Sequence, residues 1–304
     1  EGGRNSRGRP INNVIQLEEG EKVSAILAVR EFPEDQYVFF ATAQGMVKKV
    51  QLSAFKNVRS QGIKAIALKE GDYLVGAAQT GGADDIMLFS NLGKAIRFNE
   101  YWEKSGNDEA EDADIETENE DSDGLDDENA ENALPSGKHG VRPSGRGSGG
   151  LRGMRLPADG KIVSLITFAP EAEQSDLQVL TATANGYGKR TPIADYSRKN
   201  KGGQGNIAIN TGERNGDLVA ATLVSETDDL MLITSGGVLI RTKVEQIRET
   251  GRAAAGVRLI NLDEGETLVS LERVAEEAED EAALESDAAE NQVVEAEDTP
   301  SQES

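Results

Sequence analysis

The residues with the clearest chemical potential are lysines and arginines that return at one spacing. A cation stands four residues after a glycine four times along the chain: Lys49 after Gly45, Arg97 after Gly93, Arg190 after Gly186, and Arg241 after Gly237. Side chains of these types neutralise phosphates, and each one can do so without a partner residue. If they lie at regular angles around the outside of a stack of repeated units, they can hold a bent polyanion without contacting a base.

Further cations stand beside these four or in the loops that follow them. We therefore predict a DNA-contacting set of sixteen residues: Lys48, Lys49, Lys56, Arg59, Arg97, Arg146, Arg152, Lys189, Arg190, Arg198, Lys199, Lys201, Arg241, Lys243, Arg248 and Arg252. The alternative is that exposed outer strands carry Lys and Arg to discourage edge-to-edge pairing with other chains.

Other motifs resemble chemical sites without meeting their requirements. The glycines of 145–150 fit a dinucleotide-binding pattern, but they open no predicted helix. Residues 119–130 begin like a calcium-binding loop but end on alanine instead of glutamate, and the acidic pairs at 84–85 and 228–229 are assigned to turns. His139 is the only histidine, and there is no cysteine. The sequence therefore predicts no catalytic, cofactor-binding or metal-binding residue in this chain.

The elements that must carry the cations are repeated β-hairpins. An apolar run of strand-forming residues enters a glycine turn and leaves on a second strand, first in YVFFATAQGMVKKV at 37–50. The turn glycines are 48 residues apart in the first two copies and 51 in the last two, and the 93 residues between the middle pair equal one period plus an insertion. Each period adds a short strand after a glycine loop and another after an acidic glycine turn.

Four short strands per period of about 50 residues predict an all-β fold, a propeller-like ring of four-stranded blades. One such sheet cannot bury both of its faces alone, so neighbouring blades should pack face to face. Small residues at 76–78 and 220–221 indicate the strand nearest the axis, where a blade tapers.

The repeats divide the chain into one domain over residues 1–274 and an acidic tail over 275–304. We predict a truncated blade over 1–23, followed by blades over approximately 24–74, 75–162, 163–218 and 219–268. An acidic insertion at about 103–137 interrupts the second of these four, and both it and the tail have compositions typical of disordered segments. Because the chain opens and closes within a repeat, we expect it to be a fragment of a longer polypeptide.

The net charge of -23 is unevenly distributed. Residues 105–134 hold 14 acids and no base, and residues 275–304 hold 12 acids and no base. The rest of the chain has 29 acids against 32 bases, so a weakly basic body carries two acidic segments. Tethered polyanions should compete with DNA for a basic rim, or they act only as solubilising segments. There is no apolar run long enough to span a membrane and no export leader.

Several motifs agree in order and spacing with one known family. GRPINNVIQL, SAILAV, ATAQGMVKKV, MLFSNLGKAIRF, TATANGYGKRT and LITSGGVLIRT follow one another along the chain. Together they resemble the C-terminal domain of the A subunit of bacterial DNA gyrase over nearly the whole chain outside the acidic insertion.

This resemblance implies a β-pinwheel, in which adjacent blades exchange strands, and a module that wraps duplex DNA so that the holoenzyme introduces negative supercoils using ATP. It implies a non-catalytic part of a type IIA topoisomerase, with ATP and Mg²⁺ used elsewhere. The implied partners are double-stranded DNA, the rest of the gyrase A polypeptide and the separate ATPase polypeptide, gyrase B, in an A2B2 assembly. The implied location is the cytoplasm, at the nucleoid.

The chain departs from the family at its hallmark heptad, Q-R-R-G-G-K-G, which is absent; the similar NKGGQG at 200–205 falls in a later blade. The family's DNA-cleaving tyrosine belongs to the part upstream of this chain, so no tyrosine here inherits that role. Two alternatives remain open: the related domain in the A subunit of topoisomerase IV, and a propeller that serves as a protein-interaction scaffold.

Overall fold

The computed structural model describes residues 22–57, 62–102 and 140–274 of the 304-residue chain. These residues form fifteen β-strands and four short 3-10 helices, and the described ranges contain no α-helix. The predicted all-β fold is therefore confirmed. Arg59, His139, and the predicted acidic insertion and tail lie outside the described residues.

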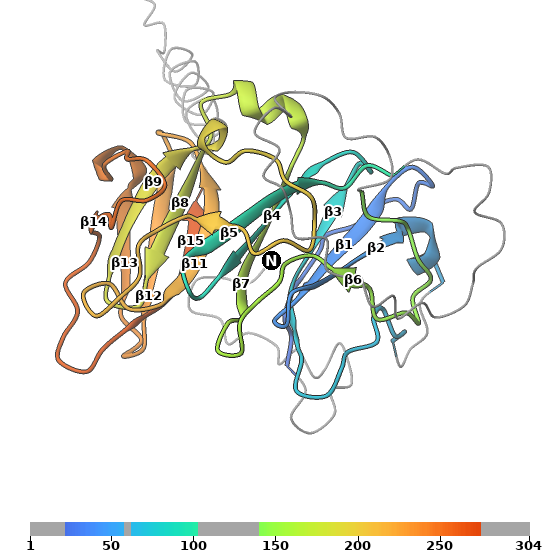
Figure 1. Ribbon diagram of the computed structural model, residues 1–304, viewed down its shortest axis with the longest axis horizontal. Coiled ribbons are helices and arrows are strands. Elements are labelled where there is room, and N and C mark those ends of the chain that lie inside the picture. Colours follow the sequence, from blue (N-terminus) through green and yellow to red (C-terminus); the bar gives the residue numbers. More distant parts are fainter. Residues whose placement is uncertain (1–21, 58–61, 103–139, 275–304) are drawn as a thin grey trace, which may run out of the picture.

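The strands form four sheets, each built around one antiparallel hairpin, and we call these sheets blades 1 to 4 (Figure 1). Blade 1 has the strand order β3 (Leu74–Thr80), β1 (Tyr37–Thr42), β2 (Met46–Gln51) and β6 (Leu151–Arg152). Blade 2 has the order β10 (Asn206–Ile207), β5 (Lys94–Asn99), β4 (Asp85–Ser90) and β7 (Ile162–Phe168). Blade 3 has the order β11 (Leu218–Val224), β8 (Gln178–Thr183), β9 (Tyr187–Pro192) and β14 (Val257–Arg258). Blade 4 has the order β13 (Leu239–Lys243), β12 (Asp229–Thr234) and β15 (Leu268–Val274).

The 3-10 helices are single turns next to the hairpins. Three of them directly follow the second hairpin strand of blades 1, 3 and 4, and one precedes the hairpin of blade 3. They are η2 (Leu52–Phe55), η4 (Ile193–Asp195), η5 (Val244–Gln246) and η3 (Pro170–Gln174).

The two-residue outer strand of blades 1 to 3 comes from the chain that follows the next blade's hairpin. Thus β6 follows the hairpin of blade 2 but pairs with β2 of blade 1. In the same way β10 pairs with β5, and β14 pairs with β9. This is the strand exchange that the family resemblance implied. No blade is one continuous segment, and the predicted blade boundaries stay predictions about where each repeat begins.

All four hairpins use the same glycine turn. The backbone φ angles of Gly45, Gly93, Gly186 and Gly237 lie between 73° and 81°, a region that L-residues with a Cβ rarely adopt. Each glycine donates its N–H to the carbonyl three residues earlier, at 2.9 to 3.0 Å. The glycine that recurs in the sequence is therefore required by the turn, and it sets the register of the two strands.

The core consists of layers between neighbouring blades. In β4, the fully buried Ile86 and Leu88 pack with Phe39 of blade 1, while Met87 and Phe89 on the opposite face pack toward blade 3. A third layer joins blades 3 and 4. Because alternate residues of one strand face opposite sides of a sheet, blade 2 buries both of its faces. The predicted face-to-face packing is confirmed.

The strands β3, β7, β11 and β15 lie at one edge of each sheet and contact one another in succession. A Cβ atom added to Gly76 of β3 would lie 3.5 Å from the Cβ of Leu165 in β7. The blades therefore approach most closely along this edge, where the sequence analysis placed the small residues. The opposite edge carries the exchanged outer strands.

Candidate nucleic-acid interface

The sixteen predicted cations do not share one surface. Six are exposed: Lys56, Arg152, Lys199, Arg241, Lys243 and Arg248. Four are half-buried: Arg146, Arg198, Lys201 and Arg252. Five are buried, with 0 to 8 % of their surface exposed: Lys48, Lys49, Arg97, Lys189 and Arg190. The expectation that the hairpin cations form an exposed rim is therefore wrong for these five, and they are excluded from the interface that we propose.

Strand exchange is the cause of this burial. The loop that leads to each outer strand runs beside the second hairpin strand of the preceding blade and covers its cation. Isolated parallel bridges mark these contacts: Lys49 with Pro143, Arg97 with Arg198, and Arg190 with Glu249. The hairpin cations are thus enclosed between a sheet and a loop that belongs to the next repeat.

Arg97 has the most complete set of partners. Its guanidinium pairs with Asp85, with the Nε atom at 2.8 Å from Oδ2, and its Nη2 lies 2.8 Å from Glu173 Oε2. Its Nη1 also donates to the Tyr196 carbonyl at 3.0 Å. Arg198 of the covering loop shares the Asp85 carboxylate at 2.9 Å. Asp85 is fully buried and begins β4, so its assignment to a turn was wrong; its charge is balanced by two arginines.

Lys49 and Arg190 also pair with carboxylates. The Lys49 Nζ lies 3.6 Å from Glu100 Oε2, and neither side chain is more than 2 % exposed. Burial lowers the pKa of Lys49 and raises the pKa of Glu100, and the mutual attraction of the pair opposes both shifts. Arg190 Nη2 lies 3.0 Å from Glu226 Oε1. These cations join segments of the fold and are not available to a phosphate.

Lys48 and Lys189 are buried against backbone carbonyls instead of carboxylates. The Lys48 Nζ donates to the carbonyls of Ala65, Arg146 and Ser148 at 2.7 to 3.0 Å. The Lys189 Nζ donates to the carbonyls of Gly251, at 2.6 Å, and Arg252. Burial lowers the pKa of each lysine to about 8. Both amines hold the loop that carries a more exposed arginine, Arg146 or Arg252.

The cations that can reach a ligand recur at two positions relative to the glycine before each outer strand. Those glycines are Gly150, Gly205 and Gly256. Four residues earlier stand Arg146, Lys201 and Arg252, and two residues later stand Arg152, Ile207 and Arg258. Each of the last three pairs across strands with the residue after a turn glycine: Arg152 with Met46, Ile207 with Lys94, and Arg258 with Tyr187.

The outermost cross-strand pair therefore carries one cation in each of blades 1 to 3, from either strand. Where the outer strand has Ile207, the hairpin strand supplies Lys94. The sequence analysis missed Lys64, Lys94 and Arg258. Lys64 and Arg258 share with Arg152 a place two residues after a recurring glycine, so that spacing could have identified them. Lys94 could not be identified in this way, because only the strand register brings it to the same pair.

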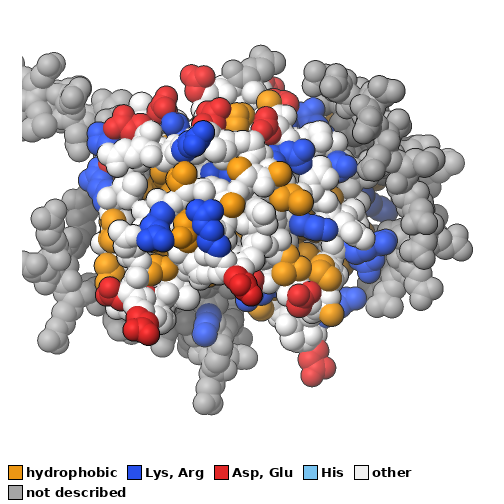
Figure 2. Space-filling view, turned by 60° about the vertical axis from the view of Figure 1, so that its left-hand side comes forward, with side chains coloured by type: hydrophobic (Ala, Val, Ile, Leu, Met, Phe, Trp, Pro, Cys, Tyr) orange, Lys and Arg blue, Asp and Glu red, His pale blue; other side chains and the backbone are white. Residues whose placement is uncertain are grey.

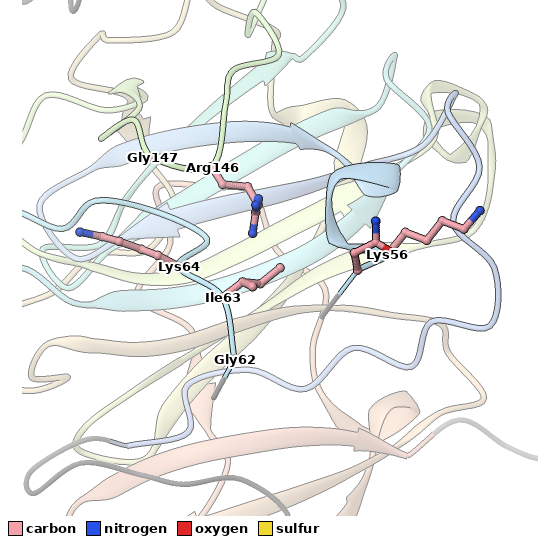
Figure 3. A pocket seen from close by; sticks show the side chains of 7 residues that line it. Lys56, Gly62, Ile63, Lys64, Arg146 and Gly147 are labelled. Atoms are coloured by element: carbon pink, nitrogen blue, oxygen red, sulfur yellow. The ribbon is translucent and has the colours of Figure 1, made fainter. Parts of the chain in front are cut away.

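A shallow pocket beside blade 1 gathers three cations. Lys56, Lys64 and Arg146 line it with Asn57, Gly62, Ile63 and Gly147, and no carboxylate is among these residues. In Figure 3, the Arg146 side chain reaches into the space above Ile63, while Lys56 and Lys64 extend to its two sides. Its charge and its openness suit the backbone of a polyanion better than an enclosed small molecule.

The surface seen in Figure 2 follows the same distribution. Lys and Arg side chains spread over the middle of the face that brings the left-hand side of Figure 1 forward, and most Asp and Glu side chains lie nearer its margins. Within the described ranges, no helix is long and apolar enough to cross a membrane. The same residues contain no group of three or more His, Asp or Glu side chains arranged to hold a metal ion.

The fold and the site together define the class of this protein: a β-propeller with exchanged strands and a basic outer edge. The chain belongs to the DNA gyrase C-terminal domain family, whose description is a β-propeller. The family model matches residues 1–30, 36–80, 84–101, 139–169, 178–225 and 228–275.

Curated relatives carry the same name. The chain is 94 % identical over 279 residues to the DNA gyrase A polypeptide of Neisseria gonorrhoeae, 46 % identical over 291 residues to that of Aeromonas salmonicida, and 40 % identical over 278 residues to that of Escherichia coli K12. These matches cover 91 to 92 % of this chain and 27 to 31 % of the relatives. The chain thus spans about 30 % of the length of the proteins it matches.

Two solved structures share the fold. A DNA gyrase A C-terminal domain aligns with a TM-score of 0.66 at 22 % identity, over 89 % of this chain and 76 % of that one. The C-terminal domain of a DNA topoisomerase IV aligns with a TM-score of 0.71 at 22 % identity, over 91 % and 75 %. The structural likeness shows the propeller fold, whereas the family match and the curated relatives favour gyrase over the topoisomerase IV alternative.

Proposed function

We propose that this chain is the DNA-wrapping module of the gyrase A polypeptide. The observation that carries the proposal is the single cation at the outermost cross-strand pair of each complete blade, Arg152, Lys94 and Arg258 in turn. Successive blades repeat this charge along one edge, so a duplex that follows the edge meets a cation at regular steps. Contacts to phosphates alone suffice to hold such a curve.

The exposed and half-buried loop cations extend this edge. Of the residues predicted from the sequence, we retain Lys56, Arg59, Arg146, Arg152, Arg198, Lys199, Lys201, Arg241, Lys243, Arg248 and Arg252 as proposed contacts, and we add Lys64, Lys94 and Arg258. Bending duplex DNA around this edge would let the holoenzyme introduce negative supercoils with ATP. We infer that the rest of gyrase A and the ATPase polypeptide, gyrase B, supply the catalytic groups, in an A2B2 assembly at the bacterial nucleoid in the cytoplasm.

The test compares two triple variants of equal charge change. Lys94→Gln, Arg146→Gln and Arg152→Gln remove cations of the proposed edge, and Lys22→Gln, Lys69→Gln and Lys161→Gln remove exposed cations elsewhere. Titration of a long duplex at several salt concentrations measures the slope of log affinity against log salt. We expect the first triple to flatten that slope by up to about 2.7, at about 0.9 per lost phosphate contact, and the second to change it much less.

Equal slopes for the two triple variants would remove the outer edge from the account and leave only net charge. Negligible binding of the unmodified chain at low salt would favour the scaffold alternative. A specific observation supports that alternative: the exposed apolar side chains of Val238, Leu239 and Ile240 at the unpaired edge of β13, which a partner strand could cover.

A further inference from the structure

Tyr187 lies between two arginines that the repeat pattern does not predict. The Arg214 guanidinium carbon is 4.5 Å from the Tyr187 ring centroid, and that of Arg258 is 5.4 Å from it. The Arg258 Nη2 also donates to the Tyr187 hydroxyl oxygen at 2.8 Å. Tyr187 begins β9, Arg258 ends β14, and Arg214 belongs to the turn before β11, so three separate segments converge on one ring.

The charges of this trio are not balanced inside the described structure. Within the described ranges, neither Arg214 nor Arg258 forms an ion pair with a carboxylate, and the other polar partner of Arg258 is the Asn261 Oδ1 at 3.1 Å. The buried Arg97, by contrast, has two carboxylates. Two guanidinium groups held against one ring repel each other, so an anion placed between them would lower the energy of the cluster.

The fold does not require this cluster. At the equivalent hairpin position blade 1 has Met46 and blade 2 has Lys94, and no aromatic ring lies there. The turns that correspond to Arg214 stand two residues before Gly71, Gly160 and Gly265, and they carry Lys69, Ala158 and Asp263. The trio is therefore a feature of blade 3 alone, added to a turn that forms elsewhere without it.

We propose that Tyr187, Arg214 and Arg258 form a binding site for a phosphate oxyanion, and that its ligand is a phosphodiester of the duplex held along the outer edge. This assignment rests on the proposed DNA-wrapping function. Guanidinium groups offer paired N–H donors that match phosphate oxygens, and stacking on the ring restricts both side chains before the ligand arrives. The Tyr187 hydroxyl stands beside them as a further donor.

The site has a signal of its own. Arg258 and Arg214 hold the pKa of the Tyr187 hydroxyl below its ordinary value, through hydrogen bonding and their positive charge. A bound phosphate would neutralise that charge, so the pKa of Tyr187 should rise when DNA occupies the site. Tyrosinate absorbance of the full chain, measured against pH with and without duplex, follows this rise, and Tyr187→Phe identifies which tyrosine produces it.

The binding experiment uses Arg214→Gln and Arg258→Gln, with Lys69→Gln as the matched control at the equivalent turn of blade 1. Each arginine variant should flatten the salt slope for duplex binding by about 0.9, and the control should leave it nearly unchanged. Should Arg258→Gln fail to fold, Arg214→Gln and the Tyr187 titration still decide the matter.

The outcomes separate this site from the proposed function. If wild type binds DNA and both arginine variants match it, with no change in the Tyr187 titration, the site is overturned while wrapping stands. If wild type does not bind DNA, the proposed function itself fails. A third arm titrates the chain with inorganic phosphate. A Tyr187 response to phosphate, without any effect of the arginine variants on duplex binding, would overturn DNA as the source of the phosphate.

Discussion

The first three hairpins and the last one share a sequence pattern but differ in their surroundings. Arg97 of blade 2 is 2 % exposed, whereas the Arg241 side chain at the same position of blade 4 is 66 % exposed, although each pairs with the aspartate that begins the preceding strand. In blades 1 to 3 a loop and an outer strand of the next repeat cover the hairpin. Within the described residues, no strand pairs with the free edge of β13.

This difference shows that one position in a repeat can serve two purposes. A covered cation becomes an internal ion pair that joins neighbouring segments, and an uncovered cation stays on the surface. The apolar residues behave alike: Val47 of β2 is fully buried, but the equivalent Leu239 of β13 is 55 % exposed. Cover by the next repeat, and not the residue type, decides what each side chain does.

The largest expected effect is the loss of a covered arginine. Arg97→Met leaves the buried Asp85 with the half-buried Arg198 as its remaining arginine partner, so we expect unfolding to become easier by about 3 to 5 kcal/mol. Arg241→Met is the matched control, with an expected loss below about 1 kcal/mol because its side chain is largely hydrated. Urea denaturation measures both. Equal losses would contradict the division between covered and uncovered hairpins.

The second prediction concerns the turn glycines. A Cβ added to Gly93 would lie 2.4 Å from the Ile209 carbonyl oxygen of the covering segment, whereas one added to Gly237 meets nothing within 4 Å. Both glycines have positive φ angles, so Gly237→Ala costs about 1 to 2 kcal/mol through backbone strain alone. Gly93→Ala adds about 1 to 3 kcal/mol of overpacking. A thermal unfolding series in which Gly237→Ala is the more damaging change would overturn this expectation.

The smallest expected effect is a pH dependence that blade 4 lacks, because Ile240 stands where blade 3 has Lys189. Between pH about 8 and its ordinary 10.5, the folded chain leaves Lys189 neutral while the unfolded chain binds the proton. The unfolded state binds more protons there, so stability attributable to Lys189 rises with pH across that window. A neutral amine can still donate to both of its carbonyl partners.

Lys189→Met tests this dependence. We expect wild type to gain stability over the variant as the pH is raised from 8 to 10.5, measured as the difference between their urea midpoints. Lys161→Met removes an exposed lysine and serves as the control, with a difference that stays flat. A wild-type advantage that shrinks as the pH rises would show that the buried amine is stabilised mainly in its charged form.

Much of the fold followed from local patterns. The recurring glycine, the apolar runs and the acidic turns predicted hairpins, blades and face-to-face packing, because turn geometry and side-chain alternation act over a few residues. The small residues of β3 likewise marked the edge where blades meet. The candidate site was only partly predictable. Arg146 and Arg152 lie where the sequence analysis expected surface cations, but Lys48 and Arg97 do not.

Taken alone, the amino-acid sequence determined the period, the hairpins, the turn glycines and the surplus of cations in the folded body. Tertiary structure decided which of those cations meet solvent. The physical reason is distance along the chain: the carbonyl of Ser148, which accepts a hydrogen bond from Lys48, lies 100 residues away in sequence. No local pattern encodes that contact, since it exists only after one repeat has donated its strand to another.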